Sequence, residues 1–167
     1  MKAVPSSTLT LPDSDDVSEG EYNKKVAASD PKFFTLLDAK NISHGGGHSK
    51  VEVADLWTSD RHLVYVKKYG GSSVLSHLFA QAAVAGELLF LDDEFRAKAN
   101  KLLPKAKQLP DGFSRSDYEI VLAIITWSKK TLTLPFFSRV NLRAAVRRLT
   151  GFGYKVTLLR VAGPRPS

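Results

Sequence analysis

Hydrophobic residues follow two different periods along the chain, and each period predicts a different kind of element. Stretches rich in β-branched and aromatic residues, bounded by turn-forming residues, are typical of strands. They occur at residues 33–42, 50–58, 62–69, 117–127 and 154–161. The short turn at 59–61 predicts a hairpin between the second and third strands, and the mostly apolar run at 117–127 predicts a central strand buried on both faces.

Apolar positions spaced three and four residues apart predict helices. These helices cover residues 18–30, 72–90, 92–103 and 137–151. The first begins with the sequence of a capping box, in which Ser18 and Glu21 satisfy backbone donors at the helix start. The segment "SHGGGHSK" (43–50) is predicted to be an exposed turn.

The resulting order, α-β-β-β-α-(α)-β-α-β, predicts an α/β fold with a mixed central sheet flanked by helices. A chain of 167 residues is long enough to bury a core in one domain. We expect a flexible arm at 1–18, a single domain at 19–162 and a tail at 163–167, because both ends are polar and Pro-rich.

Composition narrows the class of protein. The chain is 43% hydrophobic and 25% charged, which is ordinary for a globular protein, and it has no cysteine. Disulfides and thiolate metal sites are therefore excluded, and a reducing compartment suits the chain. The N-terminus lacks the apolar core of a secretory signal, and the longest apolar-rich run, 78–91, is too short to span a bilayer. We expect a cytoplasmic protein that does not bind membranes.

The net charge of +7 is concentrated in the last third of the chain. Residues 115–167 contain ten Lys and Arg against two acids, whereas the preceding residues contain fourteen against fifteen. Arg139, Arg143 and Arg147 recur every four residues on a predicted helix, and Arg148 adjoins them. Such a row suits contacts to a nucleic-acid backbone, which position the ligand without reading sequence. A solvated basic surface without a partner is the alternative interpretation.

Charged residues also interrupt the two strands of the predicted hairpin. Asp55 lies in one strand and Lys67 in the next, and a tight turn would bring them within reach of each other. A carboxylate that binds Mg²⁺, beside a lysine that steadies a water or a phosphoryl oxygen, is the minimum for metal-assisted phosphodiester cleavage. A structural salt bridge at the end of a sheet is the alternative.

The element order, together with "EVADLWTSDRHLVYVKK", resembles the PD-(D/E)XK restriction-endonuclease-like fold. Asp55 matches the first acid of that motif and Lys67 matches its lysine, so the resemblance implies a Mg²⁺-dependent nuclease. Tyr65 stands where the motif has Glu or Asp, and a further metal ligand must then come from elsewhere. The candidates are Glu52, which regular alternation turns to the other face unless a bulge intervenes, and Glu21 in the first helix.

Polar residues form one stripe on the predicted helix 72–90. Ser73, His77 and Gln81 lie four residues apart, just after Lys68. We expect these four residues to contact nucleic acid near the lysine, and members of the resembling fold often place a Gln in this helix. A solvated helix face is the alternative.

Several longer blocks resemble one bacterial family. They include "EGEYNKKVAASD", "HLVYVKKYGGSSVLSHLFAQAAVAGELL" and "LPFFSRVNLRAAVRRLTGFGYKVTL". The family is the sporadically distributed one of uncharacterised proteins, and the resemblance covers most of residues 20–161. It corresponds to the C-terminal part of that family, so the chain would be a fragment or a short member. It implies a mobile-element or phage-defence context and no particular activity.

The sequence therefore predicts a nucleic-acid-processing domain that cleaves phosphodiesters. DNA is the expected partner, and Mg²⁺, held by Asp55 and Glu52, is the expected cofactor. Two alternatives stay open. One is a catalytically degenerate module that binds nucleic acid, which Tyr65 favours, and the other is a protein-interaction domain of a larger defence protein.

Overall fold

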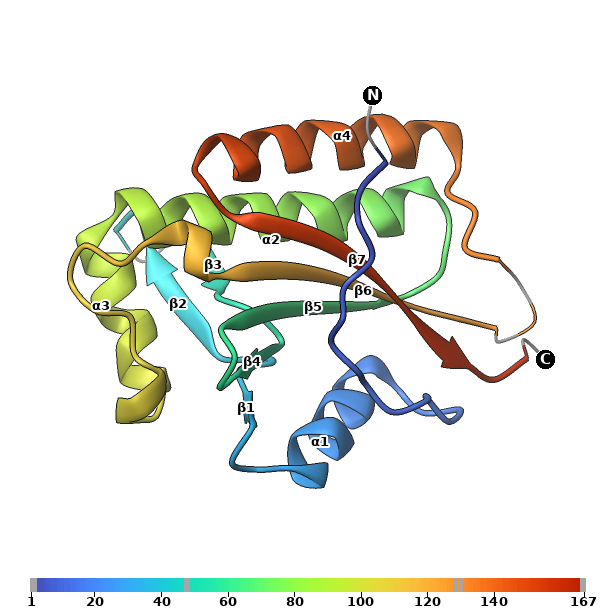
Figure 1. Cartoon of the computed structure of the whole chain (residues 1–167), viewed down its shortest axis with the longest axis horizontal. Helices are drawn as coiled ribbons and strands as arrows, with labels where there is room; N and C mark the ends of the chain where they lie inside the picture. Colours follow the sequence, from blue (N-terminus) through green and yellow to red (C-terminus); the bar gives the residue numbers. More distant parts are fainter. Residues whose placement is uncertain (1–2, 47–48, 128, 130, 166–167) are drawn as a thin grey trace.

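The computed structural model describes residues 3–46, 49–127, 129 and 131–165 (Figure 1). Its main sheet has the strand order β1-β4-β5-β6-β7, and β2 and β3 form a separate two-stranded sheet. The strands are β1 (Phe34–Leu36), β2 (Asn41–His44), β3 (Ser49–Glu52), β4 (Leu56–Thr58), β5 (His62–Lys68), β6 (Glu119–Trp127) and β7 (Lys155–Gly163). The helices are α1 (Glu19–Ser29), α2 (Ser72–Leu91), α3 (Asp93–Leu102) and α4 (Phe136–Gly151), with 3₁₀ turns at Lys105–Lys107 and Arg115–Asp117.

The main sheet is mixed, as the element order predicts. Strand β4 runs antiparallel to β1 and β5, whereas β5, β6 and β7 are parallel. Parallel neighbours need a crossover connection, which α2 provides between β5 and β6, and α4 between β6 and β7. The predicted α/β fold with a mixed sheet flanked by helices is confirmed.

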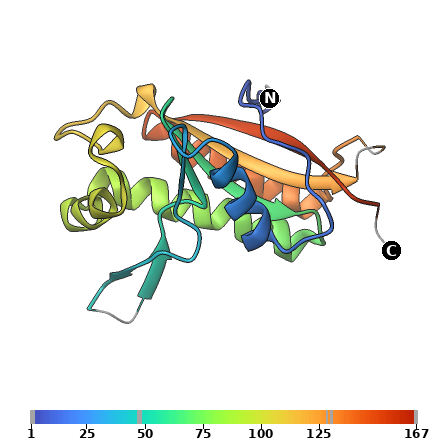
Figure 2. The ribbon, with the colours of Figure 1, turned by 90° about the horizontal axis from the view of Figure 1, so that it is seen from below.

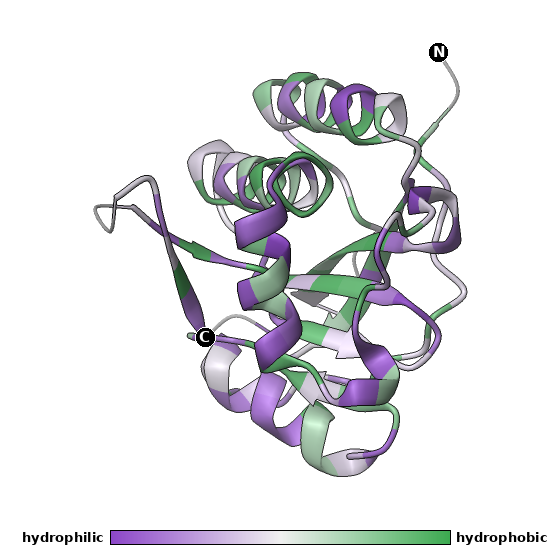
Figure 3. Cartoon of the chain, turned by 90° about the vertical axis from the view of Figure 1, so that its left-hand side faces the viewer, coloured by the Kyte–Doolittle hydropathy of each residue, from purple (hydrophilic) through white to green (hydrophobic). Residues whose placement is uncertain are grey.

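Alternation along the strands divides the core into two layers. Leu63 and Tyr65 of β5 belong to the layer under α2 and α4, while Val64 and Val66 belong to the layer under α1. Strand β6 alternates in the same way and is buried along nearly its whole length. Figure 3 shows the apolar strands in the interior, with helices of mixed apolar and polar residues around them. The predicted central strand is therefore confirmed.

The N-terminal segment, expected to be a flexible arm, is packed against the sheet instead. Ser7 N donates to Leu158 O, and Leu158 N donates to Pro5 O, both at 2.9 Å. Leu9 is buried in the layer under α1. Strand β7 is an edge strand whose backbone groups need partners, and this segment supplies them.

Two predicted strands are each broken in two. The stretch 33–42 forms β1 and β2 with a turn between them, in which Ala39 has a φ of +61°. The stretch 50–58 forms β3 and β4 with a break at 53–55. Between the breaks, β2 and β3 project from the main sheet (Figure 2). The predicted turn at 43–50 lies at the tip of this hairpin, although its residues 47 and 48 are outside the described residues.

Helix α2 is long and apolar enough, by length and composition, to cross a membrane, contrary to the expectation from the run 78–91. In the structure it has the surroundings of a core helix, with eight of its residues buried. Helix α4 packs closely on it at Gly86, where an added Cβ would lie 2.5 Å from Leu149 Cδ2 and 3.1 Å from Ile120 Cδ1. The hydrophobicity of α2 is thus explained by contacts within the chain.

Candidate functional site

The site is built where β4 separates from β5. The last pair in their register is Leu56 with Val64, and beyond it the edge of β5 continues without β4 beside it. Along this edge, two side-chain carboxylates accept the backbone hydrogen bonds that a neighbouring strand would otherwise accept. Asp55 Oδ2 accepts from Val66 N, and Glu19 Oε2 accepts from Lys68 N, each at 2.6 Å. Backbone donors that would otherwise lose a partner thus fix the position of both acids.

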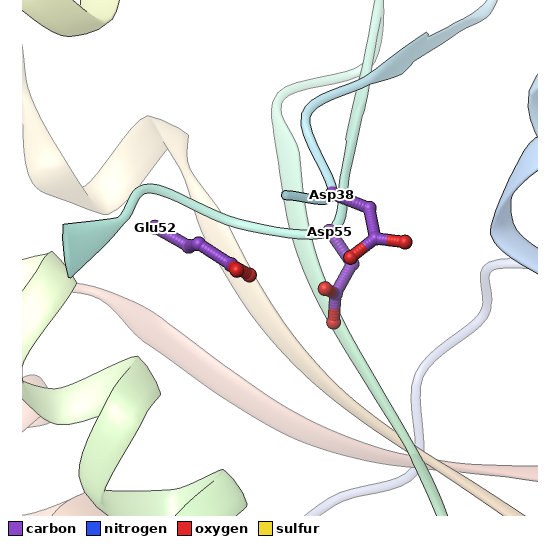
Figure 4. Close-up of side chains that lie close together, drawn as sticks. All are labelled: Asp38, Glu52 and Asp55. Carbon is purple, nitrogen blue, oxygen red and sulfur yellow. The ribbon is translucent and has the colours of Figure 1, made fainter. Parts of the chain in front are cut away.

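Three carboxylates gather beside this edge and form what we call the carboxylate cluster: Asp38, Glu52 and Asp55. One oxygen of each lies within 4.8 Å of the others. Figure 4 shows Asp38 next to Asp55, with Glu52 pointing toward both. The two strand breaks lie against each other, because Leu37 N and Asp38 N of one break both donate to Asp55 O of the other, at 2.9 and 3.0 Å. This contact brings Asp38 beside Asp55.

The cluster is electrostatically unfavourable as it stands. Asp55 is only 7% exposed, and this burial raises its pKa to about 7. The hydrogen bond from Val66 N opposes the rise, whereas the charges of Asp38, Glu52 and Glu19 add to it. Burial and the charge of Asp38 likewise raise the pKa of Glu52. A bound cation would relieve both effects, since it offsets burial and repulsion together.

A lysine and a glutamine complete the surroundings of the cluster. Lys67 Nζ lies 3.2 Å from Glu19 Oε1, and the attraction of Lys67 lowers the pKa of Glu52 against the dominant effect of burial. Gln81 Nε2 donates to Glu52 Oε2 at 3.4 Å. Strand β5 and helix α2 therefore both direct polar side chains toward the carboxylates. Of the predicted residues, Glu52 lies beside both Asp55 and Gln81, whereas the ion pair of Lys67 is with Glu19 and not with Asp55.

Glu21, the other predicted acid, lies elsewhere. Its carboxylate accepts from Ser18 N and Ser18 Oγ, both at 3.0 Å, and these bonds lower its pKa. The predicted capping box thus forms, and it turns Glu21 back onto its own helix. Glu19, two residues earlier, faces β5 in its place. The prediction that Glu21 joins the site is therefore wrong, and the acid of α1 that lies beside Lys67 is Glu19.

Sequence reasoning missed Asp38 and Glu19. Asp38 lies inside a stretch whose apolar residues predict one continuous strand, although the sequence "DAKN" around it is typical of a turn. Glu52 reaches the cluster because β3 ends there and the chain bends, which removes the alternation that would have turned it away. No bulge is required.

Tyr65 occupies the position where the resembling motif has an acid, and it is part of the core. Its ring is fully buried, and its hydroxyl donates to Val53 O at 2.5 Å. Burial raises its pKa well above the ordinary value, so it stays neutral. Tyr65 therefore holds the segment that carries Glu52 and Asp55 against β5 and contributes no ligand.

The predicted nucleic-acid contacts fall into two groups. Ser73 and His77 are exposed on the side of α2 that carries Gln81, and Lys68 is partly exposed at the end of β5. Arg139, Arg143 and Arg147, called the arginine rail here, are exposed on α4, and the neighbouring Arg148 pairs with Glu87 of α2. Helix α4 packs on α2 and contacts β7, away from the β4 side of the sheet. The structure does not bring the arginine rail to the carboxylate cluster.

These observations define an α/β domain with an acidic site at the free edge of a central strand. The chain belongs to a family of unknown function, DUF6119, whose sequence profile matches residues 1–162. A search of curated proteins and a search of solved structures gave no significant match. The membership agrees with the expected resemblance to a family without a known activity.

Proposed function

We propose that this chain is a metal-dependent, restriction-endonuclease-like domain that cleaves phosphodiester bonds in nucleic acid, with DNA as the first substrate to test. The observation that carries the proposal is the joint placement of Asp38, Glu52 and Asp55 with Lys67 at one strand edge. Oxygen ligands of this kind suit Mg²⁺. A phage-defence or mobile-element context is part of the same proposal and rests on the family resemblance alone.

The residues fit a divalent cation by charge and by donor type. Three carboxylates close together, one of them with a pKa of about 7, repel one another until a cation is present. Asp55 and Asp38 would hold the cation, with Glu52 turned toward it by the hydrogen bond from Gln81. When bound, Mg²⁺ polarises the phosphoryl group and makes a coordinated water more acidic.

The remaining work falls to the side chains of the chain itself. The ammonium of Lys67 donates hydrogen bonds to an attacking water or to a non-bridging phosphate oxygen, where negative charge grows during the reaction. Glu19 keeps that ammonium in place, because one of its oxygens pairs with Lys67 and the other accepts from the backbone of Lys68. Ser73 and His77, which are exposed on the side of α2 that carries Gln81, would contact the flanking phosphates.

A second candidate function is binding of nucleic acid without cleavage. The specific observation in its favour is Tyr65, which replaces a motif acid with a buried core residue. The arginine rail would then supply the main contacts, and the carboxylates would serve only as acceptors for the edge of β5. The two functions differ in one measurable outcome, which is the appearance of cut product.

The test is cleavage of supercoiled plasmid and of labelled single-stranded DNA and RNA with Mg²⁺ or Mn²⁺. We expect the native chain to cut at least one substrate, and Asp55→Asn and Lys67→Met each to lower the rate by roughly 10²- to 10³-fold. Glu21→Gln is the matched control, because it removes an acid from the same helix start as Glu19 while keeping a residue that can cap.

The outcomes separate the candidates. Cutting that all three variants retain equally would come from a contaminant and would remove the catalytic proposal. Binding that weakens steeply with salt, with no cut product under any metal, would favour the binding module. Neither binding nor cutting at low salt would leave the protein-interaction alternative.

A further inference from the structure

A concave site separate from the carboxylate cluster lies at the carboxyl ends of the parallel strands. A cleft of about 660 Å³ opens beside the ends of β5, β6 and β7. These strand ends lie at the right-hand side of Figure 1. The lining residues that matter here are Asp16, Lys68, Tyr69, Trp127, Thr131 and Arg165. Its volume is in the range of small-molecule sites, and ligands of open α/β sheets bind outside the carboxyl ends of the strands. None of these side chains belongs to the carboxylate cluster.

The cleft combines flat surfaces with positive charge. The Arg165 guanidinium lies over the Trp127 ring, with Cζ 5.1 Å from the ring centroid. Tyr69, which is 44% exposed, is held by a hydrogen bond from its hydroxyl to Thr133 O at 2.9 Å. Lys68 adds a second cation from the end of β5. One wall thus offers planes for stacking beside groups that attract an anion.

This combination is the chemistry that recognises a nucleotide. Bases stack on aromatic rings and on guanidinium planes, and cations beside the stack engage the phosphate. Asp16, contributed by the segment before α1, offers an acceptor for an amino group of the base or a hydroxyl of the sugar. Two cations against one carboxylate among these residues favour an anionic ligand over a neutral one.

We propose that this cleft binds a nucleotide, with the base against the wall formed by Trp127 and Arg165 and the phosphate at Lys68 and Arg165. The same chemistry fits a free nucleotide and an unpaired nucleotide of a strand. The site goes beyond the proposed cleavage, because it uses no residue of the carboxylate cluster and no metal ion.

The test is isothermal titration of the full chain in EDTA, so that metal-dependent cleavage does not occur. The probes are AMP, a short oligodeoxyadenylate, adenosine and inorganic phosphate. We expect AMP or the oligonucleotide to bind more tightly than adenosine or phosphate alone. Trp127→Leu and Arg165→Gln should each weaken that binding by roughly five- to a hundredfold. Tyr69→Leu provides an additional variant, and thermal unfolding shows whether each variant is folded.

Matched controls lie outside the cleft. Phe137→Leu removes an aromatic ring that is 69% exposed on α4, and Lys101→Gln removes an exposed charge on α3. Both should bind like the native chain. Binding of the oligonucleotide alone assigns the nucleotide to a strand, and binding of AMP at least as tightly assigns it to a free nucleotide. Either outcome supports the site.

Two results would overturn the proposal. One is that the native chain binds neither AMP nor the oligonucleotide. The other is that the folded variants Trp127→Leu, Arg165→Gln and Tyr69→Leu all bind as tightly as the native chain. Lys67→Ala separates this proposal from the cleavage proposal, because it should abolish cutting and keep nucleotide binding. A native chain that binds AMP and cuts nothing would retain the cleft and lose the nuclease.

Discussion

Replacing Asp55 by Asn should stabilise the protein at neutral and alkaline pH when no divalent cation is present. Burial raises the pKa of Asp55 from 3.8 to about 7 in the folded state. The folded state therefore binds more protons than the unfolded state between these two values, and the free energy of unfolding falls as pH rises through this window. The amide of Asn can still accept from Val66 N, so the hydrogen bond that fixes the side chain is kept.

The size of the effect follows from the pKa difference. About three pKa units at 1.36 kcal/mol each give a ceiling of roughly 4 kcal/mol. The advantage of Asp55→Asn should approach its maximum above about pH 7 and should be nearly absent at about pH 4, where Asp55 is protonated in the native fold. Asp38 and Glu52 share the excess charge, so the measured value should be part of this ceiling.

The measurement is urea unfolding in EDTA between about pH 4 and about pH 8, followed by tryptophan fluorescence, since Trp57 is buried in the core. Asp60→Asn, in the exposed turn between β4 and β5, is the control and should differ little from the native chain at any pH. A difference between the native chain and Asp55→Asn that is the same at every pH would refute the electrostatic reasoning. So would a native chain that gains stability relative to the variant as pH rises.

Gly86→Ala should lower the free energy of unfolding by about 1–3 kcal/mol, because its Cβ would meet Leu149 and Ile120. An unchanged midpoint of urea unfolding would contradict the close packing of α4 on α2. Tyr65→Phe should lower the free energy of unfolding by about 1–3 kcal/mol, because Val53 O loses its donor. The folded variant should still cut with metal. A loss of cutting without a loss of stability would give Tyr65 a direct role. Arg143→Gln should reduce the salt dependence of DNA binding: the slope of log affinity against log salt concentration, obtained by fluorescence anisotropy, should become smaller in magnitude by about 1. An unchanged slope would remove the arginine rail from the interface.

Much of the fold follows from local patterns in the sequence. The apolar run ending at Trp127 becomes a strand buried on both faces, and the capping box at Ser18 and Glu21 forms as predicted. Periodicity also places Gln81 and His77 on the same side of α2, and the hairpin register brings Asp55 beside the end of β5, where it accepts from Val66 N. These features need only the nearest neighbours in sequence or the register of one hairpin.

The missed features depend on contacts between distant segments. The strand break at Asp38 is stabilised by hydrogen bonds to Asp55 O, and no pattern within 33–42 shows that acceptor. Glu19 and Glu21 are equally acidic and two residues apart, and only the capping geometry, together with the free edge of β5, decides which one faces the site. The N-terminal segment has little apolar periodicity because it pairs through its backbone, which a search for amphipathic patterns does not detect.

That pairing has a practical consequence for anyone who shortens the chain. A version that starts at α1 would uncover the outer margin of β7 and the apolar residues that Leu9 shields. Such a margin is a template for another extended segment, so a truncated protein should tend to stick to copies of itself. Tags are safer when they are added ahead of residue 1 than when they replace the N-terminal segment.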